Sequence, residues 1–149
     1  MSFRHVLVPT DGSPLSRQAA RTAVALAKRS GARVTAIFAL AEGVPSAFSG
    51  AKLYGSGVMS DEYQALARQE ARKALAVVER AARAAGVKYA GVHPLAREPW
   101  QAILRAARAH GCDLIVMATH GHGRLRALAL GSETMKVLAR SKIPVLVCR

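Results

Sequence analysis

Five short apolar runs alternate along the chain with four longer segments whose apolar residues recur at helical spacing. Most of the runs are rich in Val, Ile and Leu, a pattern typical of strands buried on both faces of a parallel sheet. The predicted strands are Phe3 to Val8, Val34 to Leu40, Val87 to Leu95, Leu114 to Met117 and Pro144 to Val147.

The helical segments carry recognisable start and stop residues. Capping Ser or Thr, Pro at the first position and early acids favour a helix start, and Gly favours its end. The predicted helices run from Pro14, after the cap Ser13, to Gly31, from Ser60 to Gly86, from Pro99 to His110 and from Ser132 to Arg140. The stretch Glu42 to Val58 has no usable periodicity and contains Pro45, so it predicts a mobile loop, a possible lid by its position.

Strands that alternate with helices through short connections predict an α/β fold, because right-handed crossovers return the chain to a parallel neighbour. We therefore expect one domain over residues 1–149, a doubly wound open five-stranded parallel sheet with four helices. Ligands of such sheets bind outside the carboxyl ends of the strands, where the strand order reverses. Pro9 to Ser13 and Ala118 to Ser132 are predicted to share that rim.

Length and composition indicate how large the core can be and where in the cell the protein is expected. A chain of 149 residues, 51% hydrophobic, is long enough to bury roughly 68–70% of its unfolded surface in one core. No apolar run approaches the roughly 20 residues that cross a bilayer, and Val6 to Val8 is too short for a signal peptide, so we expect a soluble, cytoplasmic protein with no membrane partner. Cys112 and Cys148 form neither a disulfide framework nor a metal spacing and predict free thiols.

The charge balance is strongly basic, with 22 Lys and Arg against 9 Asp and Glu and a formal net charge of +13. Such an excess speeds encounters with any anion but carries no specificity. The basic residues are spread along predicted helix faces without interleaved aromatic residues, which single-strand binding grooves require. A solvated basic surface is the favoured interpretation, and nucleic acid is not the expected partner.

The segment from Met117 to Ser132 has the pattern of a phosphate-binding loop, because a predicted strand is followed by a glycine-containing loop that leads to a helix N-terminus. Gly121, Gly123 and Gly131 permit positive φ and let backbone amides approach phosphate oxygens. Ser132 could donate its hydroxyl to a phosphate and cap its own helix. Asp11 could accept from ribose hydroxyls or reach a phosphate-bound cation.

Several other chemistries are disfavoured by the same residues. His120 and His122 lack a third ligand at metal-site spacing, so no metal is assigned to them. The His-Gly-His-Gly order after the fourth strand does not match the H-x-G-H of nucleotidyl transferases. No G-x-x-x-x-G-K-[ST] loop is present, which argues against motor-like ATP turnover.

The chain resembles the universal stress proteins over nearly its whole length, from Val6-Leu-Val-Pro-Thr-Asp-Gly-Ser13 to Ile143-Pro-Val-Leu-Val147. The ATP loop of that family is glycine, two residues, glycine, nine residues, then glycine with serine or threonine. Gly121, the nine residues to Leu130, and Gly131-Ser132 fit this spacing, whereas Ala118 stands at the first glycine.

This resemblance implies a Rossmann-like fold that binds ATP, with or without Mg²⁺, and a homodimer formed through the edge strand Pro144 to Val147. It also implies that Asp11 contacts the ribose and phosphate region, that backbone near Ala36 and Phe38 holds adenine, and that Ser132 and nearby amides hold phosphates. The candidate binding residues are Pro9, Thr10, Asp11, Ala36, Phe38, Met117, Ala118, Thr119, His120, Gly121, His122, Gly123, Arg124, Gly131, Ser132, Glu133 and Thr134.

Ala118 decides how far the loop can act as an ATP site. If its φ is positive, alanine costs on the order of 1 kcal/mol or more against glycine, and if φ is negative little is lost. Three functions stay open: an ATP-binding regulatory module of the stress response with little or no turnover, a dimeric interaction protein of the same fold that binds no nucleotide, and a weak ATPase or phosphotransfer enzyme.

Overall fold

The computed structural model describes residues 2–42, 61–120 and 130–149. Most of the predicted loop Glu42 to Val58, and the predicted helix start Ser60, lie outside these ranges. In chain order the elements are β1 (His5–Pro9), α1 (Pro14–Ser30), β2 (Arg33–Ile37), β3 (Leu40–Ala41), α2 (Asp61–Ala85), β4 (Tyr89–Val92), β5 (Leu95–Ala96), α3 (Pro99–Ala109), β6 (Leu114–Ala118), α4 (Ser132–Arg140) and β7 (Val145–Cys148).

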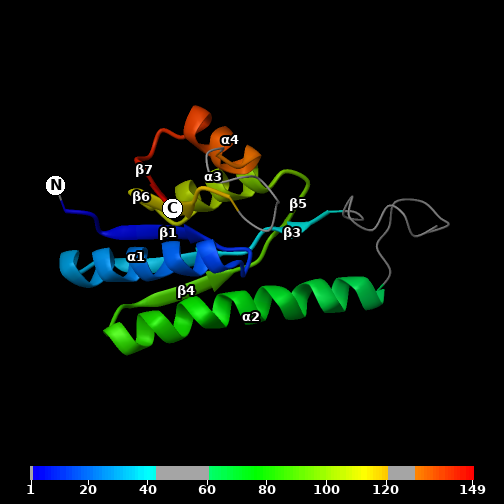
Figure 1. The fold of residues 1–149 in the computed structure, drawn as a ribbon, viewed down its shortest axis with the longest axis horizontal. Helices are drawn as coiled ribbons and strands as arrows, with labels where there is room; N and C mark the ends of the chain where they lie inside the picture. The colour runs from blue at the N-terminus through cyan, green and yellow to red at the C-terminus, as the bar shows by residue number, and fades with distance from the viewer. Residues whose placement is uncertain (1, 43–60, 121–129) are drawn as a thin grey trace.

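A five-stranded parallel sheet of order β4-β2-β1-β6-β7 forms the centre of the molecule. Helices α1 and α2 cover one face of the sheet and α3 and α4 the other, as Figure 1 shows. The order runs from β1 to β2 in one direction and from β1 to β6 in the other, so the topological switch point lies between β1 and β6. The predicted α/β class and doubly wound sheet are confirmed.

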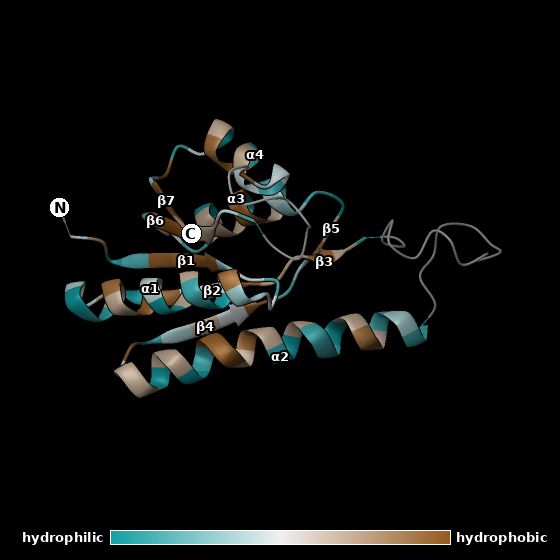
Figure 2. Ribbon diagram, in the orientation of Figure 1, coloured by the Kyte–Doolittle hydropathy of each residue, from teal (hydrophilic) through white to brown (hydrophobic). Residues whose placement is uncertain are grey.

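The core consists of two layers, one on each side of the sheet. Because successive strand side chains point to opposite faces, Val6 and Val8 pack in the layer beneath α1 and α2, whereas Leu7 packs in the layer beneath α3 and α4. The strands β1 and β6 are buried almost throughout, and Figure 2 shows the apolar colouring of β1 against the mixed colouring of α2. Both central strands are therefore buried on their two faces, as expected for the middle of a parallel sheet covered by helices.

Two of the predicted strands are each divided in the structure, so the prediction of continuous strands Val34 to Leu40 and Val87 to Leu95 was wrong. The residues Leu40 and Leu95 pair instead in a separate two-stranded parallel sheet, β3 with β5. Pro94 separates β4 from β5 and has no N–H to donate to a neighbouring strand, although its carbonyl accepts from the Leu40 amide at 2.9 Å.

Helix α1 begins and ends as its sequence indicates. The Ser13 hydroxyl accepts from the Ser16 amide at 3.2 Å, Pro14 occupies the first turn, and Gly31 ends the helix with a φ of 67°. Helix α4 differs from the prediction, because Gly131 is its N-cap residue and Ser132 is its first helical residue. The expectation that Ser132 caps its own helix was therefore wrong.

The amino end of β1, opposite to the predicted ligand rim, holds a polar cluster in which His5 and Thr35 are buried. β1 begins at His5 and not at the predicted Phe3, and Asp113 accepts from the amides of Arg4 and His5. His5 is 5% exposed, and Arg33 Nε donates to its Nδ1 at 3.0 Å. A neutral His5 then carries its proton on Nε2 and donates to Thr35 Oγ1 at 2.8 Å. Burial and the Arg33 guanidinium lower the pKa of His5 below its ordinary value.

Candidate functional site

A cavity of about 260 Å³ opens at the carboxyl ends of β1, β2 and β6, at the switch point of the sheet. Its apolar wall comes from strand ends and from the first two turns of α3, and its polar groups come from the turns that follow β1 and β6 and from the first turns of α1 and α4. The lining residues are Pro9, Thr10, Asp11, Ser16, Ile37, Phe38, Ala39, Pro99, Ile103, Met117, Ala118, His120, Glu133 and Thr134.

The turn after β1 brings a carboxylate to the cavity. Gly12 has a φ of 80°, which an L side chain rarely adopts, and the Thr10 hydroxyl accepts from its amide at 3.2 Å. Asp11 Oδ1 accepts from the Ser13 amide at 2.9 Å, which is an Asx turn. The Asx turn fixes the Asp11 carboxylate at the rim, at the start of helix α1.

Ala118 is the last residue of β6 and keeps an extended backbone. Every described residue with a positive φ is a glycine, so Ala118 has a negative φ and carries no left-handed strain. Its carbonyl accepts from the Thr134 hydroxyl at 2.9 Å, and its side chain is 9% exposed at the cavity wall. The first position of the loop motif therefore tolerates alanine without a backbone penalty.

Gly131 is required for close approach and not for an unusual φ. Its φ is −61°, so the prediction that it supplies positive φ was wrong. A Cβ at this position would lie 3.2 Å from the Thr119 carbonyl oxygen and 3.2 Å from His120 Cα, tighter than almost all real contacts. The Gly131 amide also donates to the Thr119 carbonyl at 2.6 Å. The end of β6 and the start of α4 are therefore held backbone to backbone.

Not every predicted binding residue lines the cavity. Ala36 is fully buried within β2, where it is paired with β1 and β4, whereas its neighbours Ile37 and Phe38 reach the cavity. Thr119, Gly131 and Ser132 lie beside the cavity but not in its wall, and the Thr119 hydroxyl contacts His120 Nδ1 at 3.1 Å. Gly121, His122, Gly123 and Arg124 lie outside the described residues.

Sequence reasoning missed five lining residues: Ser16, Ile37, Ala39, Pro99 and Ile103. Ile37 and Ala39 flank Phe38 in the chain and could have been inferred from it. Pro99 and Ile103 are four residues apart and share one face of α3. The sequence held no signal for α3 in the cavity wall, because its approach depends on how α3 packs on the sheet.

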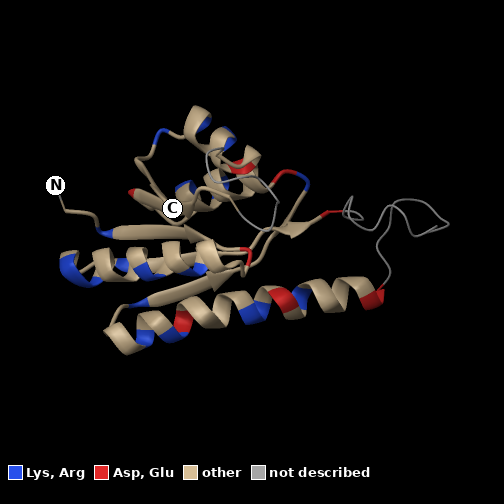
Figure 3. Cartoon of the chain, in the orientation of Figure 1, with Lys and Arg blue, Asp and Glu red and all other residues tan. Residues whose placement is uncertain are grey.

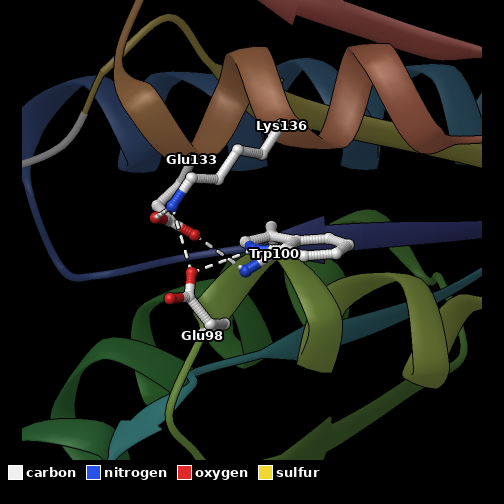
Figure 4. A network of polar contacts seen from close by, with 4 residues as sticks. All are labelled: Glu98, Trp100, Glu133 and Lys136. Atoms are coloured by element: carbon white, nitrogen blue, oxygen red, sulfur yellow. Dashed lines mark hydrogen bonds and ion pairs between the residues drawn. The ribbon is translucent and has the colours of Figure 1, made fainter.

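A polar network joins the first turns of α3 and α4 next to the cavity (Figure 4). Glu133 Oε2 accepts from the Trp100 amide at 2.8 Å, and Glu133 Oε1 lies 3.4 Å from Lys136 Nζ. Glu98 Oε2 accepts from Trp100 Nε1 at 2.9 Å and from Lys136 Nζ at 3.0 Å. Arg140 lies over the Trp100 ring, 4.7 Å from its centroid.

The network changes the ionisation of its members. Hydrogen bonds from Lys136 and Trp100 lower the pKa of Glu98, and the hydrogen bond to Glu98 raises the pKa of Lys136. Both effects favour the charged forms. One lysine contacts both carboxylates, and only Glu133 of the two lines the cavity.

These features define a class: open, doubly wound α/β proteins with a partly apolar pocket at the topological switch point. The model of the universal stress protein family matches residues 2–149. The chain is 34% identical over 149 residues to universal stress protein MJ0531 of Methanocaldococcus jannaschii, covering 99% of this chain and 82% of the relative. The chain belongs to the universal stress protein family.

Solved structures agree in fold. Protein MJ0577 of the same archaeon superposes with a TM-score of 0.81 at 23% identity, covering 99% of this chain and 96% of that one. A universal stress protein solved in complex with cAMP superposes at 0.67 with 24% identity over 99% and 97% of the two chains. The Archaeoglobus fulgidus protein solved in complex with dAMP superposes at 0.71 with 20% identity over the full length of both.

The described helices are α1, α2, α3 and α4. None of them, the 25-residue α2 included, is apolar enough over a sufficient length to cross a bilayer.

Proposed function

We propose that the protein is an adenine-nucleotide-binding regulatory module of the stress response with little or no turnover. The observation that carries the proposal is the cavity at the switch point, where the ends of β1, β2 and β6 meet the start of α4. Ligands of open α/β sheets bind at this position. Two relatives of the same fold are described in complex with cAMP and dAMP, which supports an adenine nucleotide as the ligand class.

The wall chemistry suits the two ends of a nucleotide. Ile37, Phe38 and Ala39 offer apolar surface and strand-end backbone for a purine ring. The first-turn amides of α4 have no intrahelical acceptors, and no side chain of the described residues caps them. Anions bind favourably at such helix starts. We therefore assign the base to the β2 end and the phosphates to the α4 end.

Asp11 is the described residue best suited to the ribose. Its carboxylate is fixed by the Asx turn and lines the cavity. Carboxylate oxygens accept from hydroxyls and are also ligands that Mg²⁺ prefers, so the same group suits a nucleotide that carries Mg²⁺. ATP is the nucleotide favoured by the loop motif, and the negative φ of Ala118 supports that assignment.

A homodimer formed through β7 is part of the proposal. β7 is at the edge of the sheet, one side of it paired with β6, and Leu146 is 39% exposed on it. An edge strand offers N–H and C=O groups to a second strand. The cytoplasmic location expected from the sequence is a further prediction, separate from the dimer.

Isothermal titration of the purified protein with ATP and Mg²⁺, and with AMP, tests the binding proposal. A cavity-filling variant, Ala39→Phe, is expected to lower the affinity at least tenfold, because its side chain would occupy the proposed base site. The matched control Ala41→Phe adds the same bulk to the exposed Ala41 of β3, outside the cavity wall, and is expected to bind as the wild type does.

No heat of binding at millimolar nucleotide with Mg²⁺ present would reject the proposal in favour of an interaction protein of the same fold. Steady ATP turnover that Asp11→Asn abolishes would favour the phosphotransfer alternative.

A further inference from the structure

The described wall of the nucleotide cavity is acidic although the protein as a whole is basic. Among the described residues that line it, Asp11 and Glu133 are carboxylates and none is Lys or Arg. The net charge of the chain is +13, and Figure 3 shows Lys and Arg on helices of both faces of the sheet, α4 included. The long-range field of the protein attracts anions, whereas this part of the cavity opposes them.

Glu133 occupies the part of the cavity where a carboxylate has the greatest effect on a phosphate. It is the second residue of α4, whose first-turn amides form the anion-binding end of that helix. An acid in this turn interacts favourably with the same helix dipole that would attract a phosphate. The Glu133 carboxylate and a ligand phosphate therefore compete for one positive region.

The neighbours of Glu133 keep its carboxylate in place. Its Oε2 is engaged by the Trp100 amide at 2.8 Å, in the first turn of α3, and its Oε1 lies 3.4 Å from Lys136. Lys136 is shared with Glu98 at 3.0 Å, so a single cation serves two carboxylates. Figure 4 shows the four side chains gathered between α3 and α4. With Arg140 over the Trp100 ring, the cluster holds two carboxylates and two cations, and of these four charged groups only the Glu133 carboxylate lines the cavity.

From this arrangement we infer that Glu133 is a specificity-determining residue, which disfavours nucleotides with several phosphates relative to those with one. The inference rests on the proposed function, since it concerns the nucleotide that the same cavity selects. ATP carries more negative charge than AMP, and cyclic AMP carries less. A fixed carboxylate at the phosphate end weakens binding in that order, whereas adenosine has no phosphate and is unaffected by the charge.

Two substitutions that remove equal charge separate the effect of Glu133 from that of the network. Glu133→Gln keeps a side-chain oxygen that can accept from the Trp100 amide but removes the charge at the cavity. Glu98→Gln removes the same charge from Glu98, the other carboxylate that Lys136 contacts. Glu98 does not line the cavity. Both retain an acceptor for Trp100, so both are expected to fold.

The measurement is the ratio of the dissociation constants for ATP and AMP, by isothermal titration in low salt without Mg²⁺, which would neutralise part of the ATP charge, and with adenosine as the uncharged reference. Glu133→Gln is expected to lower the ratio of the ATP dissociation constant to the AMP dissociation constant by about fivefold. This is the size of effect expected when one partly screened charge near a protein surface is removed. Adenosine affinity is expected to stay within about twofold, and the shift is expected to shrink in high salt.

Glu98→Gln is expected to leave the ratio near the wild-type value. An unchanged ratio in Glu133→Gln, or an equal shift in both variants, would overturn the role of Glu133 while leaving nucleotide binding intact. Failure of the wild type to bind adenosine, AMP or ATP would instead reject the proposed function and this inference with it.

Discussion

Replacement of Ala118 by glycine restores the first glycine of the loop motif and so tests whether that glycine is needed here. The structure predicts no benefit to binding, because Ala118 already has a negative φ at the end of β6 and its carbonyl is engaged by Thr134. The variant is instead expected to be less stable. Ala118 is paired with Cys148 of β7, and glycine at a paired strand position costs about 0.5–1 kcal/mol against alanine through lost chain entropy.

A second contribution comes from the buried methyl group. Ala118 is 9% exposed and packs in the core layer beneath α1 and α2, so its loss removes about 0.8 kcal/mol of apolar burial. The two contributions give a loss of about 1–2 kcal/mol in the free energy of unfolding, a fall of roughly 2–8 °C in Tm for a chain of this size. The matched control Ala90→Gly, at an exposed position of β4, is expected to lose only the entropic part.

Urea denaturation of both variants measures the stability change, and titration with ATP and Mg²⁺ measures the affinity. We expect the ATP affinity of Ala118→Gly to stay within about twofold of the wild type, since a twofold change is only about 0.4 kcal/mol. A tenfold gain in ATP affinity would refute the reasoning, because it would mean that the methyl group or the backbone at Ala118 obstructs the ligand. An unchanged stability would refute the packing argument.

Three further perturbations test other parts of the structure. Gly131→Ala should lower the unfolding free energy by about 1–3 kcal/mol in urea denaturation and weaken nucleotide binding, since its Cβ would lie 3.2 Å from backbone atoms; wild-type stability would contradict the close packing of β6 on α4. Because the folded pKa of His5 is lowered, its neutral form stabilises the protein fully above the ordinary value of 6.5, and this stability is lost as the pH falls below it. His5→Gln should reduce the fall in unfolding free energy between pH 7.5 and 5.5, whereas the exposed control His93→Gln should not. Equal pH slopes of the unfolding free energy in His5→Gln and wild type would argue against the buried position of His5. Val145→Lys, on the edge strand, should give a monomer in light scattering, and an unchanged dimer would exclude β7 as the interface.

The sequence was sufficient to predict the five-stranded sheet and its helices. The five principal strands fall in apolar runs, and the helices begin and end at strong signals such as Pro14 and Gly31. It was less informative where apolar residues continue past the end of a strand. Nothing in the run from Val34 to Leu40 marks the break after Ile37, since the break is set by pairing with a neighbouring strand. Pro94 was the available signal for the division of the other strand, and it was overlooked.

The candidate site was predictable in position but not in composition. Strand ends could be identified from the sequence, so Pro9 to Ser13 and Ala118 to Ser132 were expected at one rim. The structure brings described members of both segments to one cavity. The contribution of α3 depends on tertiary packing and was not foreseen. The position of the Glu133 carboxylate at the cavity was equally hidden, because its partner Trp100 is 33 residues away in the chain.

A crystal structure of the protein grown with AMP tests the central claim most directly. The account predicts purine density against the β2 end, at Ile37 to Ala39, with the phosphate directed toward the first turn of α4 and the ribose beside Asp11. Purine density at another surface, or an empty cavity at a concentration that saturates binding in solution, would contradict it.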